Sequence, residues 1–322
     1  MAINVQLGHI ARHTPKGSGA QGREAAIIDV AQDLLLRHLH EVGILDDLVF
    51  KGGTALRKLF AGRAGRFSLD LDFSLATIGA DPDEVLSKII TTINGLRLER
   101  FEYGASERRG KWTLSFSHPF GGTALSLQSK LDLSPPPWLD PIKRGWAPME
   151  IHKQYGNPPL PEIQVVRIEE NIAEKIARLN RSTPARDLYD LCWIMSNPGT
   201  IGSLDKPLIR RLALLKIWVD TNGVHAGTTY WQPGHKGLAF DPEVWLRDRS
   251  KEGFDIDDIG ALTAPSPTAS ELSDGVRTHF AFLAELDDDE GIVAHVNERD
   301  RALVLRMLSE LPGGRLIKAA LY

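Results

Sequence analysis

The sequence predicts an α+β protein in which a mixed sheet with helices is followed by a mainly helical C-terminal domain. Before residue 135, several segments alternate apolar and polar residues with a period of two, which is typical of strands with one buried face. After residue 167, apolar residues recur at the spacing that is typical of helices. We therefore expect a flexible arm over residues 1–22, the α+β domain over 23–165 and the helical domain over 166–322.

The expected elements begin with a helix over residues 23–43 and a short strand over 48–50. A glycine-containing turn joins that strand to a helix over 54–60. The clearest strand is Arg66–Leu75, because its apolar and polar residues alternate without exception. The further elements expected in this domain are a helix over 83–96 and strands over 97–103, 111–117 and 124–133. The helices expected after it cover 168–180, 184–196, 206–221, 270–287 and 299–311, with a loop-rich stretch over 222–240.

The composition limits the classes of function. The 322-residue chain has 42% hydrophobic and 25% charged residues, as expected of a globular protein with a sizeable core. Its formal net charge of −4 gives no overall basic excess, so local patches would have to hold a nucleic-acid partner. Cys192 is the single cysteine, which excludes an intrachain disulfide and disfavours a cysteine-based zinc site. The sequence has neither a run of about 18 apolar residues nor a signal-like N-terminus, so we expect a cytoplasmic protein without a membrane span.

Two carboxylates in the expected strand over 66–75 form the first candidate site. Asp70 and Asp72 should project from one face, with Cα atoms about 6.6 Å apart. Carboxylates at this spacing can bind the two magnesium ions of a phosphoryl- or nucleotidyl-transfer site. Asp132 lies on the polar face of a later strand and could hold a metal or accept a proton if the two strands are neighbours. The pattern has two other interpretations, a solvated strand face and the metal site of a glycosyltransferase.

The turn Lys51-Gly52-Gly53-Thr54 is the second candidate feature. Glycines let the backbone approach a phosphate closely, and the N-terminus of the following helix offers free N–H groups. Thr54 would cap this helix or add a hydroxyl donor. An ordinary tight turn is the alternative, since residues 121–125 repeat the pentapeptide of residues 52–56 where we expect a hairpin loop.

The combination of these features resembles the nucleotidyltransferase fold and, more narrowly, the AbiEii/AbiGii toxin family, which includes the MenT toxins. The resemblance covers about residues 25–200, and four motifs occur in the order typical of the family. The matching segments are Lys51–Arg57, Ser68–Phe73 (Ser-Leu-Asp-Leu-Asp-Phe), Glu170–Ala177 and Arg186–Leu191.

The resemblance implies that Asp70 and Asp72 bind magnesium, that Lys175 contacts the triphosphate, and that Asp187 supports it or the metal site. On its expected helix, Lys175 falls at the edge of an apolar stripe, so it should either extend outward to solvent or meet an anion, which could equally be a carboxylate in a salt bridge. Asp187 falls in the first turn of the next helix, where the helix dipole favours a carboxylate in any case.

The resemblance also implies nucleotide contacts around the glycine turn. One further basic contact matches either Arg57 or Lys58, and the loop length leaves this choice open. Ser68 matches a family serine that can itself become modified. The expected nucleotide-binding residues are therefore Gly52, Gly53, Thr54, Arg57, Lys58, Ser68 and Lys175.

The resulting hypothesis is transfer of a nucleoside monophosphate from an NTP to an acceptor hydroxyl, with Mg²⁺ held by Asp70, Asp72 and Asp132. The resemblance implies an RNA acceptor, above all the 3′ end of tRNA, and a toxin whose antitoxin is encoded nearby. The alternatives are a nucleotidyltransferase that acts on a protein hydroxyl or a small molecule, and a degenerate module that only binds. Three basic clusters are either RNA-phosphate contacts or solvated surface, namely Arg108, Arg109 and Lys111; Lys206, Arg210 and Arg211; and Arg247, Arg249 and Lys251.

Overall fold

The computed structural model describes residues 3–121, 124, 126–180, 182–222, 246 and 259–314. Contacts between Cα atoms divide the chain into two units, and the chain passes from one unit to the other more than once. The first unit consists of Met1–Pro137, Pro141–Val166 and Gly260–Pro265. The second unit consists of Trp138–Asp140, Arg167–Ile259 and Ser266–Tyr322.

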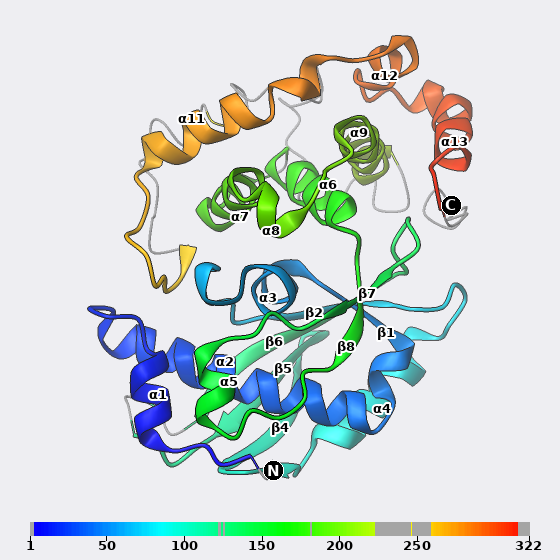
Figure 1. Cartoon of the computed structure of the whole chain (residues 1–322). Helices are drawn as coiled ribbons and strands as arrows, with labels where there is room; N and C mark the ends of the chain where they lie inside the picture. Colours follow the sequence, from blue (N-terminus) through cyan, green and yellow to red (C-terminus); the bar gives the residue numbers. More distant parts are fainter. Residues whose placement is uncertain are drawn as a thin grey trace. The chain divides into compact units, whose positions relative to one another are not determined.

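The first unit is built on an eight-stranded sheet. Its strands are β1 (Leu48–Lys51), β2 (Leu71–Leu75), β3 (Arg97–Leu98), β4 (Phe101–Arg108), β5 (Lys111–Ser117), β6 (Ser126–Ser134), β7 (Ile142–Gly145) and β8 (Glu162–Val165). They lie in the order β3-β4-β5-β6-β2-β1-β8-β7 (Figure 1). β2 pairs in parallel with β6, and β1 pairs in parallel with β8, whereas the other neighbours are antiparallel. The predicted mixed sheet is thereby confirmed.

Helices pack on this sheet and complete the core of the first unit. They are α1 (Leu7–His13), α2 (Gly19–Glu41), α3 (Gly52–Leu56), α4 (Pro82–Ile93) and α5 (Glu150–Gln154). α2 contacts β6, α4 contacts β4, and α3 contacts both β1 and β2 (Figure 1). α4 begins where local chemistry favours a helix, because Pro82 occupies its first turn and Asp81 accepts a hydrogen bond from the backbone N–H of Asp83.

The described part of the second unit is helical, as predicted. Its helices are α6 (Ile168–Leu179), α7 (Ala185–Ser196), α8 (Pro198–Ile201), α9 (Lys206–Asn222), α11 (Ala269–His279), α12 (Asp288–Val293) and α13 (Arg301–Ser309). α6 packs against α9, and α7 packs against α11. The helix expected over 270–287 is divided, because α11 ends at His279 and a separate 3₁₀ turn covers Ala281–Ala284. Residues 223–240 of the expected loop-rich stretch lie outside the described residues, as do 122, 123 and 125 of the expected hairpin loop.

The strand expected over residues 66–75 is half as long as its alternation predicts. β2 begins only at Leu71, so the five residues before it lie outside the ladder. Leu69 is 44% exposed although the alternation predicts it to be buried, whereas Ser68 and Ser74 are buried. The alternation fails at Ser74 because β2 is a central strand, and it fails at Ser68 and Leu69 because these residues lie in the irregular segment before the strand.

The flexible arm expected over residues 1–22 is wrong for the residues that the structure describes. α1 occupies Leu7–His13, and Val5 and Ile10 are completely buried. Gly17 and Gly19 form the turn into α2, with φ values of +78° and +61°. Glycine adopts this left-handed conformation without steric cost, so here it indicates a turn.

Candidate active site

Three charged residues form a row across the centre of the sheet. In the strand register, Asp72 of β2 is paired with Lys51 of β1 on one side and with Asp132 of β6 on the other. Register partners project from the same face of a sheet, about 4.8 Å apart between strands. The strands that carry the predicted carboxylates are therefore neighbours, and Asp72 and Asp132 lie side by side. Asp70 stands two residues before Asp72, immediately before β2. We call Asp70, Asp72 and Asp132 together the carboxylate row.

The glycine turn lies directly against this carboxylate row. Gly52 has a φ of +78°, and a Cβ atom added to it would lie 2.1 Å from Oδ2 of Asp72. No larger residue can occupy this position unless the carboxylate moves, and a positive φ also disfavours every residue but glycine. Glycine at position 52 therefore leaves free the space that the Asp72 side chain occupies.

The rest of the turn contacts the segment before β2. A Cβ atom on Gly53 would lie 3.0 Å from Oγ of Ser68. Thr54 is completely buried, and its hydroxyl donates to the backbone carbonyl of Asp70. The predicted capping role of Thr54 is wrong, because α3 begins at Gly52 and Lys51 is its N-cap. Thr54 instead fixes the backbone that carries the first carboxylate.

The carboxylates fit a magnesium ion whose coordination the substrate completes. Among the described residues, no three His, Cys, Asp or Glu side chains are grouped closely enough to hold a metal by themselves. Mg²⁺, however, usually keeps several waters and binds through one or two carboxylates together with substrate phosphates. Asp72 is half-buried and Asp132 is exposed, so this pair is open to solvent and to a ligand. The adjacent glycine turn offers backbone N–H groups to the phosphates.

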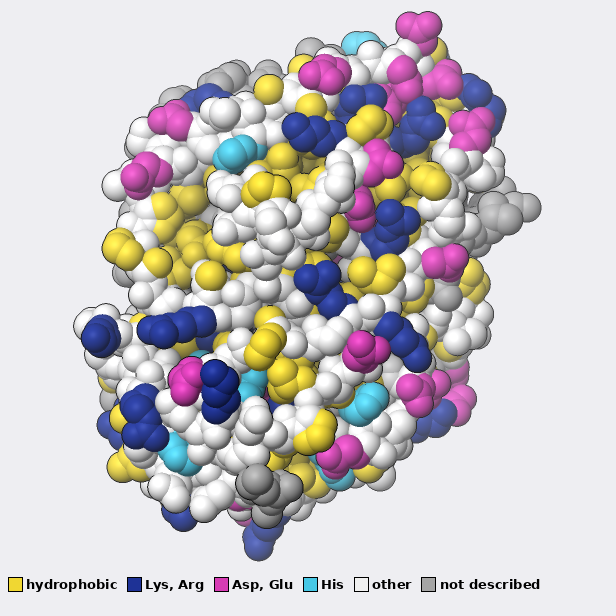
Figure 2. Space-filling model, in the orientation of Figure 1, with side chains coloured by type: hydrophobic (Ala, Val, Ile, Leu, Met, Phe, Trp, Pro, Cys, Tyr) yellow, Lys and Arg dark blue, Asp and Glu magenta, His cyan; other side chains and the backbone are white. Residues whose placement is uncertain are grey.

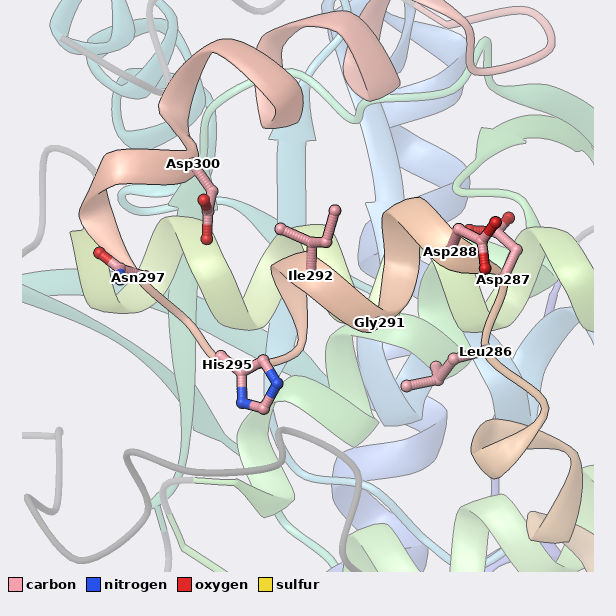
Figure 3. Close-up of a pocket in the computed structure, with 8 residues that line it drawn as sticks. All are labelled: Leu286, Asp287, Asp288, Gly291, Ile292, His295, Asn297 and Asp300. Carbon is pink, nitrogen blue, oxygen red and sulfur yellow. The ribbon is translucent and has the colours of Figure 1, made fainter.

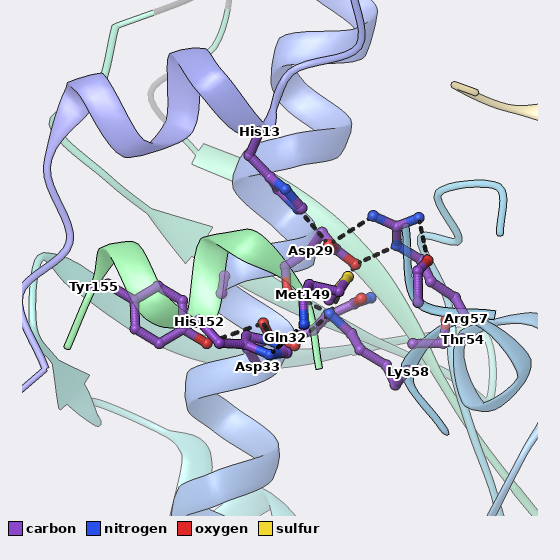
Figure 4. Close-up of polar contacts among 12 residues, drawn as sticks. His13, Asp29, Gln32, Asp33, Thr54, Arg57, Lys58, Met149, His152 and Tyr155 are labelled. Atoms are coloured by element: carbon purple, nitrogen blue, oxygen red, sulfur yellow. Dashed lines mark hydrogen bonds and ion pairs between the residues drawn. The ribbon is translucent and has the colours of Figure 1, made fainter. Parts of the chain in front are cut away.

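Arg57 and Lys58 belong to a buried ion-pair network, not to the phosphate cradle. They follow α3 and are only 1% and 0% exposed. Arg57 forms two hydrogen bonds with the Asp29 carboxylate of α2, and the Lys58 ammonium pairs with both Asp29 and Asp33 (Figure 4). The structure thus contradicts the predicted phosphate contact by one of them, because both cations are already neutralised inside the protein.

The buried network continues to α5, and the sequence analysis did not identify it. Asp33 accepts a hydrogen bond from the Tyr155 hydroxyl at 3.2 Å and lies 3.1 Å from Nε2 of His152. Burial alone would raise the pKa of Asp33, but Lys58 and His152 outweigh it and lower this pKa to about 2. The same balance between burial and neighbouring cations holds the pKa of Asp29 well below its usual range. Two carboxylates four residues apart within an apolar helix were the sequence signal for this network.

In the second unit, Lys175 is held by two carboxylates. Its ammonium lies 3.0 Å from Oδ1 of Asp187 and 2.8 Å from Oδ2 of Asp190, and all three residues are buried. Asp187 lies in the first turn of α7, as predicted. Burial would raise the pKa of Asp187, but the charges of Lys175 and Arg178 lower it. The salt bridge that was the alternative for Lys175 is therefore present.

The comparison with protein families decides the identity of this fold. A model of the nucleotidyltransferase AbiEii toxins of type IV toxin–antitoxin systems matches residues 33–301. The chain belongs to the AbiEii family. The match continues beyond residue 200, where the motifs that carry the sequence resemblance end. As an AbiEii toxin, the protein is a nucleotidyltransferase, and its family implies an NTP substrate and an antitoxin partner.

The solved structure of MenT4 supports this assignment. MenT4, a nucleotidyltransferase toxin from Mycobacterium tuberculosis, is 37% identical with a TM-score of 0.78, and the match covers 96% of this chain and 99% of that chain. The Helicobacter pylori protein JHP933 is 18% identical with a TM-score of 0.41, over 86% of this chain and 98% of that chain. No curated protein sequence matches this AbiEii chain. None of the described helices is long and apolar enough to span a membrane.

One predicted basic cluster of this AbiEii toxin continues the carboxylate row. Arg108, Arg109 and Lys111 are exposed at the tip of the β4–β5 hairpin. The pairing of β5 with β6 reaches Trp112 and Leu131, which are the chain neighbours of Lys111 and Asp132. The strand register therefore leads from the Asp132 carboxylate to the basic hairpin tip on the same sheet.

The other basic clusters give no comparable surface. In the second unit, Nε of Arg210 and Nε of Arg211 lie 2.7 and 3.4 Å from the Glu290 carboxylate. Lys206 lies 5.5 Å from the centre of a phenylalanine ring. Most of this cluster is therefore engaged within the protein. The third cluster, Arg247, Arg249 and Lys251, lies outside the described residues.

A cavity of about 630 Å³ in the second unit does not form a catalytic site. None of the predicted site residues lines it. Asp287 and Asp288 lie together at one end of it, and Asp300 lies at the other end, so the three carboxylates do not converge (Figure 3). Asp287 also caps α12 and pairs with Arg211, so it has a structural role.

Proposed function

We propose that this toxin transfers a nucleoside monophosphate from an NTP to the 3′ end of an RNA, with tRNA as the expected acceptor, in a Mg²⁺-dependent reaction. The observation that carries this proposal is the contact between Gly52 and the Asp72 carboxylate, with Asp132 beside it in register. This arrangement combines a phosphate cradle with two adjacent metal-binding carboxylates. Because NTPs and tRNA are cytoplasmic, we propose that the toxin acts there.

In the proposed reaction, the acceptor hydroxyl oxygen forms a bond to the α-phosphorus, and the bond from that phosphorus to the bridging oxygen of the β-phosphate breaks. Pyrophosphate leaves, and a carboxylate of the row, Asp132 being the exposed one, accepts the hydroxyl proton. The N–H groups of Gly52 and Gly53 orient the phosphates. Bound Mg²⁺, held by Asp70 and Asp72 together with the substrate phosphates, would neutralise the charge that develops on the triphosphate, which leaves Asp132 to accept the proton.

Lys175 and Asp187 remain proposed participants on the basis of their family motifs. Lys175 would contact the triphosphate, and Asp187 would fix the lysine ammonium, which lies 3.0 Å from its carboxylate. Ser68 remains the proposed site of modification on the basis of its family motif, and it lies beside the glycine turn, since a Cβ atom added to Gly53 would lie 3.0 Å from its Oγ.

The basic hairpin tip supports an RNA acceptor. Arg108, Arg109 and Lys111 are exposed, and the strand register joins them to the carboxylate row. Three strand intervals separate Asp72 from Arg108 across the sheet, or about 14 Å. A sugar-phosphate backbone could therefore contact the tip while its terminal hydroxyl reaches Asp132.

Incubation with each α-³²P-labelled NTP and a mixed RNA pool tests this function. We expect Mg²⁺-dependent label on RNA, and sequencing of the RNA 3′ ends identifies the nucleotide and the acceptor. Parallel incubations contain a protein extract or a small-molecule extract. Label only on protein or on a small molecule would favour the alternative nucleotidyltransferases, and no label with any acceptor would favour a degenerate module.

A further inference from the structure

A second pocket in the first unit gathers positive charge. Its volume is about 250 Å³, and it is enclosed by α1, the loop into α2, the 3₁₀ turn Gly62–Ala64 and α5. Its basic lining residues are Arg12, His13, Lys16, Arg57 and Arg63, whereas Glu150 is the acidic residue of the described lining. No residue of the glycine turn or of the carboxylate row lines this pocket, so it is distinct from the candidate active site.

Among the described residues, no carboxylate pairs with the cations at the rim of this pocket. Lys16 and Arg63 are exposed, and neither has a carboxylate partner within the part of the chain that the structure describes. Nε of Arg12 donates to the neutral amide oxygen of Gln154 at 3.2 Å. The Glu150 carboxylate lies 3.4 Å from the ammonium of Lys153 and is thus itself paired. Several cations without counter-charge in a concave site attract an anion.

The floor of the pocket is fixed by the buried network. Nε2 of His13 lies 2.7 Å from Asp29, which also binds Arg57 (Figure 4). Nη1 of Arg57 donates to the backbone carbonyl of Gly65 at 2.6 Å, immediately after the turn that carries Arg63. The pocket is therefore preorganised, which lowers the entropy that a ligand must lose on binding.

We propose that this pocket binds a phosphate group and is a second anion site of the toxin, separate from the site of nucleotidyl transfer. Guanidinium groups match the oxygens of phosphate in paired hydrogen bonds, and two of the rim cations, Arg12 and Arg63, are arginines. A volume of about 250 Å³ accommodates one phosphate with its sugar, not an extended ligand. The phosphate can come from an RNA chain or from a free nucleotide, and the experiment below distinguishes the two.

Histidine NMR on the full chain tests the proposal, because His13 lies on the pocket floor. The ring signals of ¹³C-labelled histidine are followed during a titration with inorganic phosphate at constant pH, and His13→Gln assigns the signal. We expect a saturable shift of the His13 signal in the wild type. In the Lys16→Glu/Arg63→Glu variant, loss of two charge-assisted contacts should weaken the binding of phosphate by about tenfold or more.

A matched variant controls for net charge. Lys88→Glu/Arg97→Glu changes the charge equally on the same unit, at exposed residues outside the pocket, and should bind phosphate like the wild type. The proposal would be overturned if phosphate does not shift the His13 signal, or if both double variants lose affinity equally.

Three further probes identify the source of the phosphate. If the pocket binds RNA backbone, a short single-stranded RNA shifts the His13 signal with or without a 5′-phosphate. If it binds a terminal or free phosphate, only the 5′-phosphorylated RNA and AMP do so. No response to any of the three contradicts the proposal. These titrations require no turnover and can be made with the Asp70→Asn variant, so a failure of nucleotidyl transfer does not affect them.

Discussion

At the residue scale, Gly52 connects the backbone conformation with the proposed chemistry. Its φ of +78° suits glycine, and the Asp72 carboxylate occupies the space where a side chain would begin. Gly79 provides a natural comparison, because its φ is +81° but a Cβ atom there would have no neighbour within 4 Å. A larger residue at either position strains the backbone, but only at Gly52 does it also displace the Asp72 carboxylate. A comparison of substitutions at the two positions therefore distinguishes these two effects.

We predict that Gly52→Ala reduces nucleotidyl transfer by about 100-fold, because the methyl group displaces the Asp72 carboxylate by an ångström or more. Gly79→Ala should introduce only the backbone strain, about 1–2 kcal/mol, and leave the rate unchanged. The initial rates of label incorporation and the Tm of both variants test this. A Gly52→Ala protein as active as Gly79→Ala would contradict the assigned role of the turn.

The residues around Gly52 also show which features local sequence patterns can predict and which they cannot. The pairing of Asp-x-Asp with a glycine turn could be predicted, because both motifs are local and chemically distinctive. The exposure of Leu69 and the hydrogen bond from Thr54 to Asp70 could not, because the packing around an irregular segment decides them. Arg57 and Lys58 were misassigned since sequence spacing does not reveal that α2 brings two carboxylates to them.

At the scale of elements, α2 holds the helical segment after the glycine turn through a buried charge network. Asp29 neutralises both Arg57 and Lys58, and all three side chains are almost completely buried. Breaking such a network leaves unpaired charges inside the protein. The glycine turn, immediately before this segment, should therefore depend on α2 for its position.

We predict that Asp29→Ala lowers the free energy of unfolding by about 3–5 kcal/mol, because the buried Arg57 loses its carboxylate partner and the buried Lys58 loses one of its two. The matched substitution Asp47→Ala, whose carboxylate is about half exposed, should change it by less than about 0.5 kcal/mol. Urea denaturation measures both values. Equal stability of the two variants would show that the network does not stabilise the fold.

The same network predicts the acid sensitivity of the protein. The folded-state pKa values of Asp29 and Asp33 lie below those of the unfolded chain, near 2 for Asp33. Their contribution to stability is therefore complete above an unfolded pKa of about 3.9 and is lost as the pH falls through that value toward 2. Urea denaturation between about pH 5 and 3 should have a weaker pH dependence for Asp29→Asn than for the wild type.

Most long elements were predictable, whereas several short ones were not. α6, α7 and α9 begin and end within about two residues of the expected ranges, because their amphipathic periods repeat over three or more turns. β7 and β8 have four residues each, which is too short for a period to be recognised. α5 was missed for the same reason, and with it the partners that His152 and Tyr155 offer to Asp33.

At the scale of the whole molecule, long-range contacts decide which segments belong to which unit. The buried Glu170 carboxylate accepts hydrogen bonds from the backbone N–H groups of Trp138 and Leu139, at 2.8 and 2.9 Å, and thus joins this segment to the second unit. Glu170 also binds Lys216 at 2.9 Å. The first residue of a family motif therefore has a structural role here, which no local pattern could indicate.

Two buried lysines of the second unit allow a matched test of the proposed triphosphate contact. Lys175 and Lys216 each pair with two carboxylates and are at most 11% exposed. We predict that Lys175→Met and Lys216→Met both destabilise the protein by about 3–5 kcal/mol, since each removes an ammonium that pairs with two carboxylates. At a temperature where both remain folded, only Lys175→Met should raise the KM for the NTP. An equal effect on KM would assign Lys175 to the fold alone.

The central claim is that the carboxylate row performs nucleotidyl transfer, and the Asp70→Asn variant tests it most directly. The measurement is the amount of label that each purified protein incorporates into RNA with Mg²⁺. The proteins compared are wild type, Asp70→Asn and the control Asp47→Asn, and a circular dichroism spectrum of each shows whether it is folded. We predict native spectra for all three proteins, transfer by wild type and Asp47→Asn, and none by Asp70→Asn. A folded Asp70→Asn protein that transfers label at the wild-type rate would contradict the mechanism.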